Sequence, residues 1–343
     1  MAIRILVPLD GSSLAATALA HALALTAPQE AHITLLRVVE RTSAQQSVDP
    51  LDWHLQRSEA QAYLEQTSEL LKELLPVAPE IVLLEGRAAD RIVDYAQSER
   101  CDFLVFTSHG RGGLTGWNMS SVASKIAVRA ATSMLIVRSS PTSVSQYVGT
   151  LQPVRYRRIL VPLDGSQRAE HVLPIAGALA EQHGAELVLL HVVNKPELIQ
   201  RMPLTEEEIG LVDKVVARNE RQASEYFDQL GSRLPVRPDT RVLIEEDVAG
   251  AVHRFANDNM VDLVVLSAHG HTGRPQWAVG SLVTSFLTHG TTSLLIMQDM
   301  PRHATTPTKL ESETHTWREE GLRATLNTNP LGEPGFNYDR AAN

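Results

Sequence analysis

The sequence repeats itself, with the same motifs in the same order in two successive segments. Residues 5–12 read ILVPLDGS, and the same eight residues return at 159–166. Near the end of each copy, TSMLIV at 132–137 matches TSLLIM at 292–297. A repeat of this length indicates the duplication of one whole structural unit. The chain of 343 residues is therefore predicted to form two similar domains followed by a C-terminal tail.

The repeat also predicts the domain boundaries. We expect a first domain over residues 1–141, a linker over 142–156, a second domain over 157–299 and a tail over 300–343. The linker region is rich in Ser, Thr, Pro and Gln and has no apolar period. The tail has few residues of the kind that build a core, so we predict that it is disordered.

Short apolar runs alternate with helical periodicity in each copy, which is typical of a doubly wound α/β fold with two tandem five-stranded parallel sheets. The expected strands cover 3–8, 32–39, 80–84, 103–106, 133–137, 158–162, 186–193, 240–244, 263–266 and 293–297. The first expected helix ends near residue 27, and the others cover 51–75, 88–98, 121–130, 167–183, 205–230, 248–257 and 281–288. Pro174 lies inside the helix over 167–183 and should kink it or leave one carbonyl unpaired.

Composition and charge argue against several classes of protein. The net charge of −9 disfavours a general nucleic-acid-binding surface, which needs a basic face. The single cysteine, Cys101, cannot form an internal disulfide, which fits a reducing compartment. The first apolar run is too short for a signal peptide, and no run approaches the length of a membrane span. We therefore expect a cytoplasmic protein without membrane or nucleic-acid contacts.

The loop after the fourth strand carries the strongest functional signal in each copy. In the second copy the apolar run 263–266 leads into SAHGHTG, and Gly280 opens the next helix. The first copy has the same arrangement within 102–121. Glycine lets the backbone approach an anion, and free N–H groups at a helix start point at it, so this pattern suits phosphate. The alternative is that the glycines only turn the chain.

These motifs together resemble the universal stress protein family, and the whole chain resembles its tandem members over about residues 1–299. Nucleotide-binding members carry Gly-x-x-Gly, nine residues, and then Gly-Ser or Gly-Thr after the fourth strand. The second copy differs from this pattern at Ser267 alone, whereas the first copy differs at Thr107 and Ser120. The resemblance implies a Rossmann-like, adenine nucleotide alpha-hydrolase-like fold that binds ATP, with AMP or ADP as alternatives.

The resemblance further implies which residues bind the nucleotide. In the second domain they are Pro162, Asp164, Val192, Ser267, His269, Gly270, Gly280, Ser281 and Leu282. The weaker set in the first domain is Pro8, Asp10, Val38, Thr107, His109, Gly110, Ser120 and Ser121. Alternatively, each aspartate forms a turn or N-cap, each valine belongs to the core, and each histidine bonds backbone. Because Ser120 stands where glycine would let phosphate approach, we expect the second domain to bind more tightly.

Three functions remain open. The first is a non-enzymatic, ATP-binding stress-response or signalling protein, with Mg²⁺ held by the phosphates and not by a protein cage. The second is a slow ATPase or phosphotransfer enzyme, and the third is a scaffold that binds nothing. No Gly-x-x-x-x-Gly-Lys-Ser/Thr motif is present, no Gly-x-Ser-x-Gly elbow follows a strand, and no catalytic residue or metal site is evident. We therefore favour binding over catalysis, with a protein partner that the sequence does not specify.

Domains of this family pair through their fifth strands. The apolar runs 134–137 and 294–297 would be unpaired sheet edges if the two domains stood apart. We therefore expect the two domains to pair with each other within one chain. A homodimer of the whole chain is a further alternative.

Overall fold

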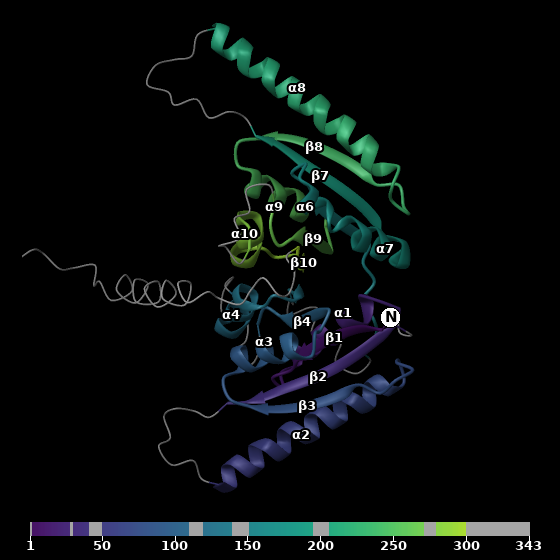
Figure 1. Ribbon diagram of the computed structural model, residues 1–343, viewed down its shortest axis with the longest axis vertical. Helices are drawn as coiled ribbons and strands as arrows, with labels where there is room; N and C mark the ends of the chain where they lie inside the picture. Colours follow the sequence, from purple (N-terminus) through teal and green to yellow (C-terminus); the bar gives the residue numbers. More distant parts are fainter. Residues whose placement is uncertain are drawn as a thin grey trace, which may run out of the picture. The chain divides into compact units, whose positions relative to one another are not determined.

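A computed structural model describes residues 2–27, 30–40, 50–109, 119–138, 151–194, 206–270 and 279–299. Two successive sets of five strands run through them (Figure 1). The first half, within residues 1–141, contains β1 (Ile3–Pro8), β2 (Ala31–Val39), β3 (Glu80–Glu85), β4 (Phe103–Thr107) and β5 (Ser133–Val137). The second half, within residues 157–299, contains β6 (Arg158–Pro162), β7 (Glu186–Asn194), β8 (Asp239–Glu245), β9 (Leu263–Ser267) and β10 (Ser293–Met297).

Helices connect these strands in both halves. In the first half they are α1 (Ser13–Ala24), α2 (Pro50–Lys72), α3 (Ala88–Ser98) and α4 (Ser121–Arg129). In the second half they are α6 (Gln167–Glu170), α7 (Leu173–His183), α8 (Glu206–Gly231), α9 (Val248–Asp258) and α10 (Ser281–His289). The alternation of strands and helices confirms the predicted α/β fold class.

One predicted helix is wrong. The sequence predicted a single kinked helix over 167–183, but the chain forms two helices, α6 and α7, with a turn between them. Pro174 lies in the first turn of α7, where its missing N–H costs no intrahelical hydrogen bond. Proline therefore begins a new helix here and does not bend an existing one.

The strand order places a topological switch point in each half. The sheet has the order β3-β2-β1-β4-β5-β10-β9-β6-β7-β8. Neighbours within each half are parallel. The order reverses between β1 and β4, and again between β6 and β9. In doubly wound sheets, ligands bind outside the carboxyl ends of the strands at such a point.

Strands β5 and β10 pair with each other in antiparallel fashion, with a reciprocal register. Leu135 lies opposite Leu295 at the centre of the ladder, and these two leucines are equivalent in the repeat. Met134 lies opposite Ile296, and Ile136 opposite Leu294. The hydrogen-bonding edges of both strands are therefore covered by each other, which removes the exposed edge that a separate half would have.

Further hydrogen bonds continue this ladder beyond the strands. The N–H of Arg138 donates to the hydroxyl oxygen of Ser293 at 3.2 Å. The equivalent N–H of Gln298 donates to the hydroxyl oxygen of Ser133 at 3.1 Å. The side-chain amide of Gln298 also donates to the carbonyl of Ala130, at the end of α4, at 3.2 Å.

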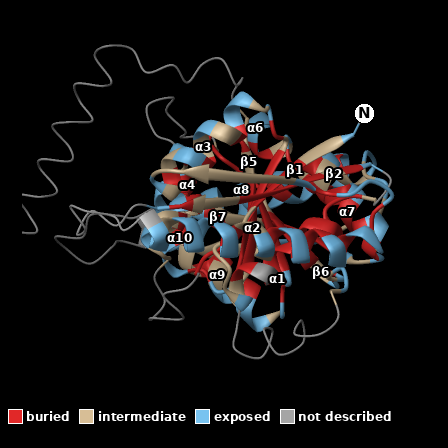
Figure 2. Ribbon diagram, turned by 90° about the horizontal axis from the view of Figure 1, so that it is seen from below, coloured by how far each residue is buried: buried red, intermediate tan, exposed pale blue. Residues whose placement is uncertain are grey.

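The helix α1 is buried almost all round, because it packs against the sheet and against residues of the second half. Figure 2 shows the buried residues, in red, concentrated in the strands and in the helix faces that cover them. His183 on α7 bonds the carbonyl of Ala24 at 2.8 Å. His21 on α1 shares a hydrogen bond of 2.9 Å with the hydroxyl of Tyr156, whose ring also packs edge-on against His183.

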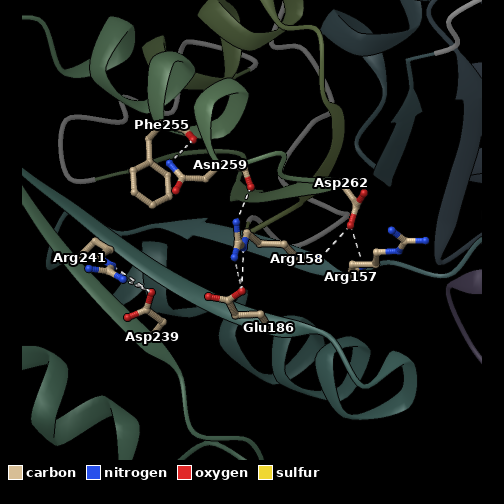
Figure 3. A network of polar contacts seen from close by, with 8 residues as sticks. All are labelled: Arg157, Arg158, Glu186, Asp239, Arg241, Phe255, Asn259 and Asp262. Atoms are coloured by element: carbon tan, nitrogen blue, oxygen red, sulfur yellow. Dashed lines mark hydrogen bonds and ion pairs between the residues drawn. The ribbon is translucent and has the colours of Figure 1, made fainter.

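A polar network holds the amino ends of β6, β7 and β9 together (Figure 3). One carboxylate oxygen of Asp262 accepts the N–H groups of Arg157 and Arg158, at 2.6 and 2.9 Å. The guanidinium of Arg158 donates to the carbonyl of Asn259 at 2.6 Å and to Glu186 at 2.6 and 2.8 Å. This network lies at the sheet edge opposite the switch-point loops, so it contributes to the scaffold and not to the candidate site.

Part of the predicted domain plan lies outside the described residues, namely the end of the first domain at 139–141, residues 142–150 of the linker and the whole tail, 300–343. The exact domain and linker boundaries therefore stay predictions. In the described part of the chain, no helix has both the length and the apolar character that crossing a bilayer requires.

Candidate functional site

Asp164 and Gly270 meet at the switch point of the second half. Asp164 follows β6 and Gly270 follows β9, and these two strands are parallel neighbours. A Cβ atom added to Gly270 would lie only 2.4 Å from the Oδ2 atom of Asp164. A side chain at position 270 would therefore displace the carboxylate. The predicted aspartate and the predicted glycine are brought together here.

The same aspartate also forms a turn, as the alternative interpretation proposed. Its Oδ1 atom accepts the N–H of Ser166 at 3.0 Å and the Ser166 hydroxyl at 2.6 Å. In the first half, Oδ1 of Asp10 accepts the N–H of Ser12 at 2.9 Å. Gly110, the predicted partner of Asp10, lies outside the described residues. The turn role and the site role are thus compatible, because the turn engages Oδ1 while Oδ2 faces Gly270.

The helices that follow the two loops begin differently. Gly280 is the N-cap of α10 and supplies no side-chain acceptor. Ser120 is the N-cap of α4, and its hydroxyl oxygen accepts the N–H of Ala123 at 3.2 Å. The first N–H groups of a helix have no partner within the helix, and they carry the positive end of its dipole. The start of α10 therefore offers its amides to an anion, whereas Ser120 already engages one amide of α4.

An equivalent backbone hydrogen bond joins the two described ends of each loop. The N–H of Gly280 donates to the carbonyl of Ala268 at 2.7 Å, and the N–H of Ser120 donates to that of Ser108 at 2.9 Å. A Cβ atom at Gly280 would lie 3.4 Å from the Ala268 oxygen, an ordinary contact. Packing within the protein therefore does not demand glycine at 280, and a role for this glycine in phosphate approach stays a prediction.

His269 is held by an acidic residue that the sequence reasoning missed. Its Nδ1 atom lies 2.7 Å from Oδ1 of Asp299, and the two side chains are only 2% and 5% exposed. A carboxylate only accepts, so the hydrogen lies on Nδ1. Oδ2 of Asp299 lies 3.8 Å from Nε of Arg168 on α6. These contacts join the ends of β9 and β10 to the start of the helix after β6.

A sequence signal for Asp299 did exist. Ser267 and Met297 are register partners in the parallel pair of β9 and β10. His269 and Asp299 each lie two residues further along the chain, so they emerge side by side from the same edge. Because the predicted strands 263–266 and 293–297 are both followed closely by these residues, a parallel pairing of the two strands indicates the juxtaposition.

His109 has a different environment in the first half. Its Nδ1 atom lies 3.0 Å from the hydroxyl of Ser108, and its Nε2 atom is buried without a hydrogen-bond partner among the described residues. Thr107 donates its hydroxyl to the carbonyl of His109. In the second half the hydroxyl of Ser267 is buried and also lacks a partner among these residues. The described ends of the two loops therefore share one backbone hydrogen bond, whereas the partners of their histidines differ.

The remaining predicted residues lie around these loops. Val38 and Val192 are partly buried and pack against the core beneath the last helices, as does Leu282 at the start of α10. The other predicted residues are Pro8 and Pro162, which are partly buried at strand ends, and Ser121 and Ser281, which are exposed in the first helical turns. Both valines thus pack against the core near the carboxyl ends of β2 and β7, which suits either interpretation.

Other features of the described chain do not compete with this site. No group of three or more His, Cys, Asp or Glu side chains in the described ranges is arranged to hold a metal ion. A surface hollow beside β3 and α3 lies away from the switch point; it is lined by Leu84, Glu85, Arg91, Asp94, Tyr95 and Ser98. Its walls include no predicted site residue, and we favour the switch point because loops, helix start and carboxylate converge there.

Comparison with known proteins then decides the family. The family model described as "Universal stress protein family" matches residues 1–138 and 155–298. The chain belongs to the universal stress protein family. The matched ranges cover both copies of the repeat, so this universal stress protein is a tandem member, as the motifs predicted.

The relatives of this universal stress protein are distant. Universal stress proteins of Mycobacterium bovis and Mycobacterium tuberculosis are each 25% identical to it over 198 residues, which cover 55% of this chain and 59% of each relative. The chain thus matches less than two thirds of the length of these relatives.

Solved structures support the fold. A functionally unknown protein from Pseudomonas aeruginosa has a TM-score of 0.60 at 18% identity, covering 92% of this chain and 98% of its own. A universal stress protein from Archaeoglobus fulgidus has a TM-score of 0.55 at 16% identity, covering 86% and 95%. At these identities the likeness establishes the α/β fold alone.

Proposed function

We propose that this universal stress protein binds an adenine nucleotide, with ATP as the ligand and the second half as the main site. The observation that carries the proposal is the convergence of Asp164, Gly270 and the start of α10, whose N-cap Gly280 has no side-chain acceptor, at one switch point. A carboxylate at this edge suits the hydroxyls of a ribose, and the helix start suits phosphates. AMP and ADP are the alternative ligands.

Each group of the nucleotide would meet matching chemistry. Val192, partly buried at the end of β7, offers an apolar surface to the adenine ring. The amides of Gly270, Ser281 and Leu282, with the Ser281 hydroxyl, would donate to phosphate oxygens. Mg²⁺ would be held by the phosphates themselves, since this ion keeps several waters and needs few protein ligands.

The first half would bind more weakly. Ser120 already caps α4 through its hydroxyl, so an incoming phosphate would have to compete with that bond for the N–H of Ala123. His109 has no acidic partner among the described residues, because its Nδ1 atom faces the hydroxyl of Ser108. The first half then serves chiefly as the partner that covers β10.

A second candidate is slow ATP hydrolysis by the same site. The bond between His269 and Asp299 favours it, because a carboxylate that orients a histidine is a common support for a general base. Phosphate release by the purified chain, compared with that of His269→Gln, distinguishes turnover from binding. Equal phosphate release by the two proteins would exclude hydrolysis by His269. The third candidate function is a scaffold that binds no nucleotide.

We also propose that the two halves stay paired through β5 and β10 in solution and that the protein is cytoplasmic. The buried thiol of Cys101 forms no disulfide, which is compatible with a reducing compartment. If the pairing closes within one chain, light scattering should give a mass near 37.6 kDa at low protein concentration. Twice that mass would favour the homodimer instead.

The proposed function is tested by nucleotide content and by titration. The purified protein is denatured, and the released nucleotide is identified by chromatography. ATP is then titrated into the full chain and into Gly280→Val and Ser120→Val. We expect Gly280→Val to weaken binding about tenfold or more, as one or two amide contacts are worth that much, and Ser120→Val to leave it nearly unchanged. No released nucleotide and no heat of binding would overturn the proposal.

A further inference from the structure

Residues 298 and 299 connect the interface between the two halves directly to the candidate site. Gln298 donates its N–H to Ser133 of the first half at 3.1 Å and its side-chain amide to Ala130 at 3.2 Å. The next residue, Asp299, bonds His269 at 2.7 Å. One peptide unit therefore separates a contact with the first half from a contact with the nucleotide loop of the second.

His269 in turn belongs to the stretch of backbone that lies against the start of α10, where the phosphates would rest. The preceding residue, Ala268, accepts the N–H of Gly280 at 2.7 Å. A Cβ atom on Gly280 would lie 3.7 Å from Cα of His269 and 3.8 Å from the nitrogen of Gly270. The backbone around His269 thus packs against the N-cap of α10. The bond from Asp299 therefore anchors the residue at which this backbone adjoins the start of α10.

The bond between His269 and Asp299 is strong enough to do this. Both side chains are almost completely buried, at 2% and 5% exposure. A buried carboxylate that loses its partner incurs a large desolvation penalty, so the bond is costly to break. Arg168 lies 3.8 Å from the second carboxylate oxygen and adds an attractive charge.

The first half does not repeat this arrangement. His109 bonds the hydroxyl of Ser108, a neutral group on the adjacent residue of its own loop. The register of β4 and β5 pairs Thr107 with Val137, so the position equivalent to Asp299 is Ser139. That residue lies outside the described ranges, but serine cannot supply a carboxylate in any conformation.

We propose that Asp299 is a positioning residue of the nucleotide site and that the first half sets its place through Gln298. The inference rests on the proposed function, which it deepens. Asp299 holds His269, and His269 holds Gly270 and the start of α10 in the geometry that receives phosphate. Preorganising such a site removes the free energy that a loose loop would spend on ordering itself around the ligand.

The first test separates phosphate binding from nucleoside binding. ATP and adenosine are each titrated calorimetrically into the full chain, Asp299→Asn, His269→Gln and the double variant. We expect each single variant to bind ATP about tenfold more weakly and adenosine within about twofold of the wild type. The double variant should be no weaker than the weaker single one, because both changes interrupt the same chain of contacts.

The second test addresses the link to the first half with two matched serines. Ser133→Ala removes the bond to Gln298, whereas Ser293→Ala removes the equivalent bond to Arg138. Each change deletes one hydroxyl and one hydrogen bond across the same ladder. We expect ATP binding to weaken about threefold in Ser133→Ala and to stay unchanged in Ser293→Ala.

The outcomes are decisive in each arm. Equal losses of ATP and adenosine affinity in Asp299→Asn, or losses that multiply in the double variant, would overturn the positioning role. Equal ATP affinities in the two serine variants would overturn the link through Gln298. If Asp299→Asn does not fold, His269→Gln provides the comparison of ATP with adenosine, and the two serine variants still test the link through Gln298. A wild-type chain that binds neither ligand would instead overturn the proposed function itself.

Discussion

The guanidinium of Arg138, in the first half, donates to the carbonyl oxygen of Phe286, in the second half, at 2.9 Å. The same Nη2 atom lies 2.8 Å from the carbonyl oxygen of Leu287. These carbonyls belong to the end of α10, where a helix leaves acceptors without partners and favours a cation. Burial lowers the pKa of Arg138. The side chain of Arg138, from the first half, therefore caps the C-terminal end of α10 in the second half.

Removing this guanidinium should destabilise the protein. We expect Arg138→Met to reduce the free energy of unfolding by about 1.5–3 kcal/mol, because two carbonyls lose a charged donor in a buried interface. Urea denaturation measures the change. Arg129→Met is the control, since the ion pair of Arg129 with Asp90 is nearly half exposed on both sides and should be worth less than about 1 kcal/mol. Equal losses in the two variants would contradict the capping role.

The histidine at the interface of α1 should make stability depend on pH. Burial lowers the pKa of His21 from 6.5 to about 4. The unfolded chain therefore binds a proton first as the pH falls, and the contribution of neutral His21 is complete above about pH 6.5 and is lost from there toward pH 4. Between pH 7.5 and pH 5 we expect a loss of about 2 kcal/mol from this residue.

The variant His21→Gln isolates that contribution. Its free energy of unfolding should fall less than that of the wild type between the two pH values, as measured by urea denaturation at each. Burial also lowers the pKa of His253, which adds a change of the same sign to both proteins and cancels in the comparison. Parallel pH dependences in the two proteins would show that His21 is not the group responsible.

Exchanging the N-cap residues of α4 and α10, Ser120 and Gly280, should change protein stability and ATP affinity in different ways. In Gly280→Ser, the new hydroxyl can accept the N–H of Val283, as Ser120 does for Ala123. We expect the free energy of unfolding to rise by roughly a few tenths of a kcal/mol. ATP affinity should fall severalfold, because the N–H of Val283 is no longer available to a phosphate. Ser120→Gly should lower stability slightly and leave ATP affinity unchanged. Calorimetric titration and thermal melts give both quantities, and a gain of affinity in Gly280→Ser would contradict the proposed anion site.

The acidic residues at the opposite edge of the sheet should affect stability alone. Asp262 accepts two backbone N–H groups, whereas Asp102 accepts that of Arg4 at 2.9 Å. We expect Asp262→Ala to cost about 1–2 kcal/mol and Asp102→Ala about 1 kcal/mol, measured by urea denaturation. ATP affinity should stay the same in both, since neither residue lies near the switch-point loops. A weaker nucleotide affinity in either variant would show that this edge is coupled to the site.

The fold was predictable because the repeat gave every strand twice. The run at 133–137 was recognisable as β5, and its copy at 293–297 as β10, with the observed bounds. Pro174 indicated an irregularity in the predicted helix over 167–183, but it did not show that the chain forms two separate helices there. Helical periodicity continues on both sides of it, so the pattern does not show that α6 ends at Glu170 and that α7 begins at Leu173.

The candidate site was only partly predictable. Asp164 and Gly270 follow apolar strands in recognisable motifs, so the sequence located them. Asp299 follows a strand with no motif around it, and its partner His269 lies 30 residues away. The roles of Arg138 and Gln298 were not predictable from the sequence, because they arise from pairing between the two halves and not from any pattern within one half.

Equivalent positions need not keep equivalent residues once two copies share a chain. In a dimer of identical subunits, every substitution at the central ladder would appear twice, once at each end of the symmetry axis. Here the two ends hold different residues, Arg138 facing α10 and Gln298 facing α4. Because both copies belong to one chain, each end can change without the other. One copy can then support a ligand site that only the other copy contains, and neither copy has to do both.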